Sequence, residues 1–216
     1  MKTRFIFTAL IFLALPVFAQ IEQAGIAPGA TGRLADLLNK PAVVKPATAT
    51  SQRNWYTTEM DAHVFTDQAS FRQIVEVLRD IENTEKHFTG KNARLRASVV
   101  SRGNNETIAD FTSVTPPLTR HYQVSVKIPA NTDTVFVSET RQTPDDNETN
   151  RGMRNFSSLR YVEELTIDGK KYTYIRAFNV NDVYIPLPVT RSTVERNSDA
   201  VNLETLQLII EAARNR

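Results

Sequence analysis

The dipeptide Asp168-Gly169 constrains the fold most, because it predicts a two-residue hairpin loop between two long runs of strand-forming residues. A loop of this length fixes the register of the two strands, residues 156–167 and 170–180. The predicted cross-strand partners are Ile167 with Lys170, Leu165 with Tyr172, Glu163 with Tyr174, Tyr161 with Arg176, and Leu159 with Phe178. Because side chains alternate along a strand, the last four pairs share one face of the sheet.

This face is mostly aromatic and apolar, and it carries one acid, Glu163, and one base, Arg176. The two are diagonal neighbours within reach of long side chains. A buried ion pair costs desolvation and adds little to stability, so one interpretation is a polar anchor inside an elongated apolar cavity. The alternative is that both lie near the rim of the sheet and reach solvent. We predict the aromatic face to be the inner one. The opposite face, with Arg160, Val162 and Ile175, is mixed, and the alternative is that a strongly curved sheet buries parts of both faces.

The rest of the pattern predicts a strand, a helix, a meander of strands and a long C-terminal helix. The predicted strands are residues 55–64, 94–102, 106–114, 122–128, 133–141, 156–167 and 170–180. Apolar residues recur at helical spacing in residues 71–81 and again from residue 189 to the end of the last helix. A sheet of about six or seven antiparallel strands that is covered by a helix has an α+β architecture.

Residues 1–19 have the three parts of a secretory signal peptide, which are a basic start with Lys2 and Arg4, an apolar run, and Ala19 before the predicted cleavage site. The apolar run would span about 16 Å as a helix, about half of a bilayer core. An uncleaved anchor is therefore the less favoured alternative. We expect a soluble mature protein that is exported, either periplasmic or secreted.

Residues 20–52 differ in composition from the rest of the chain, because they are rich in Gly, Pro, Ala and Thr. This composition predicts a flexible N-terminal arm, which precedes a folded domain over residues 53–216. The alternative is that Leu34, Leu37 and Leu38 dock on the domain or on a partner.

Composition excludes several classes of site. The absence of cysteine excludes disulfides, cysteine-ligated metals and a thiol nucleophile. The three histidines have no metal-binding spacing, and the sequence has neither a phosphate loop nor a nucleophile elbow. Because Lys2 and Arg4 account for the formal net charge of +2, the mature chain is balanced and gives no support for nucleic-acid binding. We expect no catalytic residue, no metal and no cofactor.

Three segments resemble the START-like (SRPBCC) helix-grip superfamily, which includes START lipid-transfer domains and polyketide cyclase-like proteins. Residues 70–83 are similar to the family's first helix, residues 115–122 to its Pro-rich turn and the strand that follows, and residues 185–189 to the segment before its last helix. His121 stands where the family usually has Asp. The resemblance covers roughly residues 55–215 and implies a curved sheet wrapped on the C-terminal helix, with a hydrophobic tunnel between them.

The resemblance and the aromatic face together predict a cavity for a hydrophobic, lipid-like ligand. The predicted lining residues are Tyr122, Val124, Leu159, Tyr161, Glu163, Tyr172, Tyr174, Arg176, Phe178, Leu206 and Ile210. We expect a lipid carrier with transient membrane contact, and we favour binding over catalysis. Two alternatives stay open. One is an enzyme for an apolar or polyketide-like substrate, in which Glu163 or His121 transfers protons. The other is an interaction protein whose own side chains fill the cavity.

Overall fold

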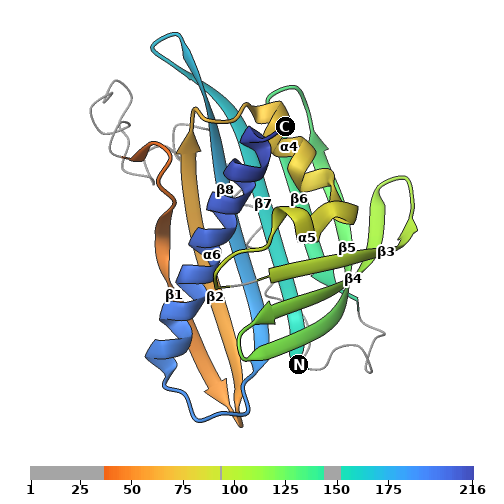
Figure 1. Cartoon of the computed structure of the whole chain (residues 1–216), viewed down its shortest axis with the longest axis vertical. Coiled ribbons are helices and arrows are strands. Elements are labelled where there is room, and N and C mark those ends of the chain that lie inside the picture. Colours follow the sequence, from red (N-terminus) through yellow and green to blue (C-terminus); the bar gives the residue numbers. More distant parts are fainter. Residues whose placement is uncertain (1–36, 93, 144–151) are drawn as a thin grey trace, which may run out of the picture. The chain divides into compact units, whose positions relative to one another are not determined.

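The computed structural model describes residues 37–92, 94–143 and 152–216, which form one antiparallel sheet and the helices that cover it (Figure 1). The strands are β1 (Ala42–Gln52), β2 (Trp55–Thr66), β3 (Arg94–Arg102), β4 (Glu106–Thr115), β5 (Leu118–Asn131), β6 (Val135–Gln142), β7 (Met153–Ile167) and β8 (Lys170–Tyr184). The helices are α4 (Phe71–Arg79), the 3-10 turn η2 (Ile81–Asn83), α5 (Thr84–His87) and α6 (Arg191–Arg214). The predicted signal peptide and residues 20–36 of the predicted arm lie outside the described residues.

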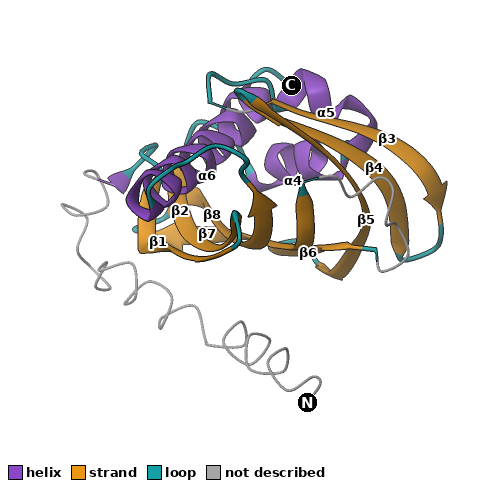
Figure 2. Ribbon diagram, turned by 90° about the horizontal axis from the view of Figure 1, so that it is seen from below, coloured by secondary structure: helices purple, strands orange, loops and turns teal. Residues whose placement is uncertain are grey.

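The sheet has eight strands in the order β1-β2-β8-β7-β6-β5-β4-β3, and every neighbouring pair is antiparallel. Figure 2 shows that the sheet is curved and that α4, α5 and α6 all lie on its concave side. This confirms the predicted α+β helix-grip architecture, with slightly more strands than expected. In the described part of the chain, no helix is both long and apolar enough to cross a membrane.

The additional strand is β1, which comes from the last eleven residues of the predicted arm and pairs with β2. Ala47 and Ala49 are buried against α6, and their neighbours along the strand are exposed. Their backbone N–H groups donate to Asp199 Oδ1 at 2.9 Å and to Glu195 Oε1 at 3.0 Å. The small side chains let α6 approach this edge strand closely, and two carboxylates of the helix satisfy its free donors. The folded domain therefore begins earlier than residue 53.

The residues just before β1 are already hydrogen-bonded to β2. Leu38 forms a parallel bridge with Phe65 of β2, and Asn39 N donates to Phe65 O at 2.7 Å. The Asn39 side chain donates to Asp67 Oδ1 at 2.9 Å and accepts from Thr66 Oγ1 at 2.6 Å. Of the three leucines that were expected to dock as an alternative, Leu38 thus contacts the sheet.

The β7–β8 hairpin has the predicted register, from Ile167 opposite Lys170 to Leu159 opposite Phe178. Asp168 and Gly169 both have positive φ values, 52° and 76°, as a two-residue turn of the type that matches strand twist requires. The β3–β4 hairpin also forms, between the strands predicted at residues 94–102 and 106–114. Local turn chemistry therefore determines the β7–β8 hairpin.

The main hydrophobic core lies between the concave face of the sheet and helices α4 and α6. Its fully buried members include Val64, Phe136, Val162, Ile175, Ala177, Leu206, Ile209 and Ile210. Helix α4 begins after Ser70, whose hydroxyl accepts from Gln73 N while Gln73 Oε1 accepts from Ser70 N, a reciprocal capping box. This core occupies one part of the concave face and leaves the other part free to enclose a cavity.

Candidate ligand-binding cavity

A cavity of about 360 Å³ lies between the concave face of the sheet and the segments that cover it. The sheet side is formed mainly by β4–β8, with one residue of β2 and two of β3. The covering side is formed by residues 77–88, the segment 185–189 and α6. Small-molecule pockets range from about 300 to 1,000 Å³, so a cavity of this volume can enclose a ligand.

Most of the cavity wall is apolar or aromatic. The apolar lining residues of the sheet side are Met60, Leu95, Phe111, Leu118, Val126, Met153, Phe156 and Val183. Those of the covering side are Val77, Leu78, Ile81, Phe88, Ile185, Leu187, Val189, Val194, Val201 and Leu208. Tyr122 lies between Phe111 and Phe156, with ring centroids 5.9 and 5.2 Å away. A wall of this kind favours a ligand with an extended apolar part.

Polar side chains gather on the sheet side of the cavity around Arg160 of β7. Arg160 Nη1 donates to Ser158 Oγ at 2.7 Å and to Asn179 Oδ1 at 2.9 Å. Asn179 Nδ2 in turn donates to Asn202 Oδ1 of α6 at 2.8 Å. These acceptors are neutral, so within the described ranges Arg160 has no ion-pair partner. Burial lowers the pKa of Arg160 to about 10, and the guanidinium stays protonated at neutral pH.

Arg120 of β5 is a second cation in the cavity wall, and its side chain is only 6% exposed. Its Nε has no hydrogen-bond partner, and nowhere in residues 37–92, 94–143 or 152–216 does a carboxylate pair with its guanidinium. Burial lowers the pKa of Arg120, and the electrostatic interaction with Tyr122 partly opposes this effect.

The predicted aromatic face of β7 and β8 lies on the other side of the sheet. In the regular part of the hairpin, the residues that meet the cavity or the core are Ser158, Arg160, Val162, Ile175, Ala177, Asn179 and Asn181. Met153, Phe156 and Val183, beyond the bulge of β7, line the cavity as well. Side-chain alternation therefore turns seven predicted lining residues away from the cavity, namely Leu159, Tyr161, Glu163, Tyr172, Tyr174, Arg176 and Phe178. The predicted register is correct, but the assignment of the inner face is wrong. Helix α6 packs on the row of small aliphatic side chains, and the bulkier aromatic row lies on the convex side.

The other four predicted residues lie on the concave side. Tyr122 lines the cavity as predicted. Val124 is fully buried next to it, in a cluster with Met153. Leu206 and Ile210 are fully buried between α6 and the sheet, so they belong to the core. The residues that the middle of α6 presents to the cavity are instead Val201, Asn202, Thr205 and Leu208.

The expected Glu163–Arg176 pair does not form. Arg176 makes two contacts with Asp61 of β2, from Nε to Oδ1 at 2.9 Å and from Nη2 to Oδ2 at 2.6 Å. Glu163 Oε2 accepts from the Tyr161 hydroxyl at 2.7 Å. Burial raises the pKa of Glu163, and the hydrogen bond from Tyr161 only partly offsets this rise. Arg176, which was predicted to anchor a ligand in the cavity, thus pairs with Asp61 on the convex face of the sheet.

Neither candidate for proton transfer lines the cavity. Glu163 lies on the convex face, and His121 is exposed, with Nδ1 3.0 Å from Thr112 Oγ1. Among the described residues, no three His, Asp or Glu side chains are grouped so that they could hold a metal ion. The geometry therefore gives no support to catalysis by these two residues in the cavity.

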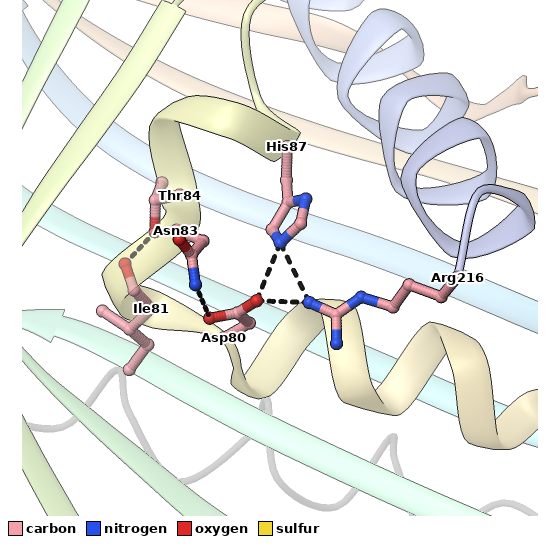
Figure 3. A network of polar contacts seen from close by, with 6 residues as sticks. All are labelled: Asp80, Ile81, Asn83, Thr84, His87 and Arg216. Carbon is pink, nitrogen blue, oxygen red and sulfur yellow. Dashed lines mark hydrogen bonds and ion pairs between the residues drawn. The ribbon is translucent and has the colours of Figure 1, made fainter.

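A polar network fixes one end of the covering segment (Figure 3). Asp80, which lines the cavity, accepts from Asn83 Nδ2 at 2.8 Å and from Arg216 Nη2. His87 Nε2 lies 3.0 Å from Asp80 Oδ2 and 3.0 Å from Arg216 Nη2. Burial raises the pKa of Asp80, but the hydrogen bonds from His87, Asn83 and Arg216 and the charge of Arg216 outweigh it and lower the pKa to about 2. The network ties residues 80–87 to the end of α6.

We expect the Asp80→Asn variant to lose about 2 kcal/mol of unfolding free energy at pH 7, because a pKa lowered from 3.8 to about 2 corresponds to this amount. The folded-state pKa is depressed, so this contribution is present above about pH 4 and disappears as the pH falls towards 2. Urea unfolding at several pH values measures it, with Asp133→Asn in an exposed loop as the control. Equal stability of the Asp80→Asn variant and the wild type at pH 7 would contradict this account of the network.

Comparison with known proteins gives a match by structure only. No family model and no curated sequence matches the chain. Human STARD10 superimposes with a TM-score of 0.57 at 13% identity, over 78% of this chain and 73% of that one. A STAR-related lipid transfer protein from Xanthomonas axonopodis gives 0.52 at 11% identity, over 77% and 99%. Human StAR-related lipid transfer protein 5 gives 0.51 at 12% identity, over 77% and 86%. The chain has a START-like fold, as its sequence resemblance predicted.

Proposed function

We propose that this protein binds a hydrophobic, lipid-like ligand in the cavity between the sheet and α6, and that it carries this ligand outside the cytoplasm. The observation that carries the proposal is the cavity of about 360 Å³ with its apolar and aromatic wall. Two proteins that share the fold are named lipid transfer proteins, which supports a ligand of the same general class. Transient contact with a membrane is part of the proposal, because a lipid carrier has to load its cargo there.

Export is the second part of the proposal, and it is supported by the signal-peptide pattern of residues 1–19. Cleavage before Gln20 predicts a mature protein that starts at this residue. Expression of the full chain in a bacterium, followed by fractionation and intact-mass measurement, tests this directly. A cytoplasmic protein that retains Met1 would contradict export and leave the cavity proposal untouched.

The Phe156→Ala variant tests which face of the sheet binds the ligand. Phe156 lines the cavity, whereas Phe178 lies on the opposite face of the adjacent strand, and both rings are partly buried. We expect Phe156→Ala to weaken binding of the neutral apolar dye Nile red by about tenfold, because apolar contact area is lost. We expect Phe178→Ala to bind the dye as the wild type does. Fluorescence titration measures both affinities, and the reverse order would place the site on the convex face.

A further inference from the structure

A band of polar side chains crosses the concave face of β6, β7 and β8, which are neighbours in the sheet (Figure 1). This polar band consists of two residues from each strand, namely Ser138 and Thr140, Ser158 and Arg160, and Asn179 and Asn181. The strand registers pair Thr140 with Ser158 and Ser158 with Asn179, so the side chains form a continuous row. All of them line the cavity, and a ligand therefore meets a polar surface on this part of the sheet.

The polar band separates the hydrophobic core from the aromatic part of the cavity wall. Along β7, the concave face passes from Val162 of the core, through the band, to Phe156 of the wall. Tyr122 lies between Phe156 and Phe111, so a row of three rings leads from the band to β4. The cavity thus has a polar end next to the core and an aromatic surface that extends away from it.

Hydrogen bonds fix the orientation of the side chains in the centre of the polar band. Arg160 Nη1 donates to Ser158 Oγ and Asn179 Oδ1, and Asn179 Nδ2 donates to α6. Ser138 and Thr140 lie beside this network on β6, directly opposite Arg160 and Ser158. A hydroxyl both donates and accepts hydrogen bonds. Since Ser138 and Thr140 line the cavity, their hydroxyls can bind an oxygen atom of a ligand.

We propose that the ligand is an amphiphile whose polar head carries a hydroxyl or carbonyl oxygen and binds Ser138 and Thr140 in the polar band. Its hydrocarbon tail then lies along Phe156, Tyr122 and Phe111. This inference rests on the proposed function, because it concerns the same cavity. It adds the chemistry of the head and the direction of the ligand, with the head next to the core and the tail towards β4.

Thiol labelling tests the direction of the ligand, because the chain has no cysteine of its own. One variant, Ser138→Cys, places a thiol in the polar band. The other, Ser113→Cys, places it on β4 beside Phe111, where Ser113 also lines the cavity. The probe is N-dodecylmaleimide, which has a head with carbonyl oxygens and a hydrocarbon tail. The thiol adds across the double bond of the maleimide and its proton moves to the neighbouring carbon, so mass spectrometry detects the intact probe on the protein.

We expect the Ser138→Cys variant to react at least about tenfold faster than the Ser113→Cys variant, because a bound head is held next to the thiol. Each rate is divided by the rate of the same variant with N-ethylmaleimide, which corrects for the accessibility and reactivity of the thiol. A faster reaction at residue 113, or equal normalised rates, would overturn the proposed direction. If Ser138→Cys does not fold, Thr140→Cys places the thiol in the same band.

Removal of both hydroxyls tests the chemistry of the head. The Ser138→Ala/Thr140→Val double variant is titrated with 1-octanol, 2-octanone and 1-octene, each in competition with Nile red. We expect binding of 1-octanol or 2-octanone to weaken by about tenfold and binding of 1-octene to change by no more than about twofold. The oxygen compound with the larger loss identifies the head as hydroxyl or carbonyl. Ser113→Ala removes a hydroxyl from the cavity wall outside the polar band and, as the matched control, should change none of the three affinities. If the double variant does not fold, each single variant is measured instead.

Failure of this inference is distinguishable from failure of the proposed function. Unchanged affinities in the double variant, or an equal loss for 1-octene and both oxygen compounds, overturn the inference and leave binding of apolar ligands intact. If the wild type binds neither Nile red nor any of the three compounds, the proposed function and the inference are both overturned.

Discussion

Replacement of Phe136 by alanine is expected to lower the free energy of unfolding by about 3–5 kcal/mol. Phe136 of β6 is fully buried in the core cluster that joins the sheet to α4 and α6. Removing its ring leaves a cavity that a close-packed core refills only in part. Since small domains are stable by about 5–15 kcal/mol, the loss is a large fraction of the total.

Chemical denaturation of the mature protein measures the effect of Phe136→Ala. Val100→Ala is the control, because Val100 is 55% exposed and its methyl groups contribute little to the core. We expect the control to change the unfolding free energy by no more than about 0.5 kcal/mol. A loss below about 1 kcal/mol for Phe136→Ala would contradict the position of the core.

The Val201→Trp variant is expected to weaken ligand binding by more than about tenfold, which corresponds to about 1.4 kcal/mol. Val201 lies on the side of α6 that lines the cavity, so an indole ring there occupies part of the 360 Å³ available to the ligand. The core residues of α6, such as Leu206 and Ile209, are on another side of the helix, so the fold should be retained.

The neighbouring residue provides a matched control for Val201→Trp. Ala200 is exposed and does not line the cavity, so Ala200→Trp adds the same ring on the outside of the helix. Nile red titration of both variants separates blocking of the cavity from a general effect of tryptophan. Unchanged binding by Val201→Trp, with the fold confirmed by circular dichroism, would exclude this cavity as the site.

Turn chemistry explains why the β7–β8 hairpin could be predicted from the sequence. Asp168-Gly169 adopts the two positive φ values that this loop needs, and the register of β7 on β8 follows from it. The same information does not reveal which face is covered. Both faces of the hairpin carry bulky or apolar residues, and only the packing of α6 selects the row with Val162 and Ile175.

Other features depended on contacts between distant segments. β1 resembles a linker in sequence, because Ala and Thr alternate, and it becomes a strand only by pairing with β2 and receiving the carboxylates of α6. Arg120 lies in the family-like segment 115–122, but its burial in the cavity wall becomes visible only when the cavity forms around it. Arg160 could have been predicted to line the cavity. It shares a face of β7 with Val162, so a correct choice of the inner face would have placed it there.

The central claim is that the cavity holds a lipid-like ligand, and native mass spectrometry of the mature protein purified from an exporting cell tests it most directly. We predict a stoichiometric adduct of lipid mass that organic extraction removes, that is retained by the Ala200→Trp variant and that is lost from the Val201→Trp variant. A bare protein mass that stays unchanged after incubation with a total lipid extract would contradict the claim. That result would favour an interaction protein with a START-like fold that carries no ligand.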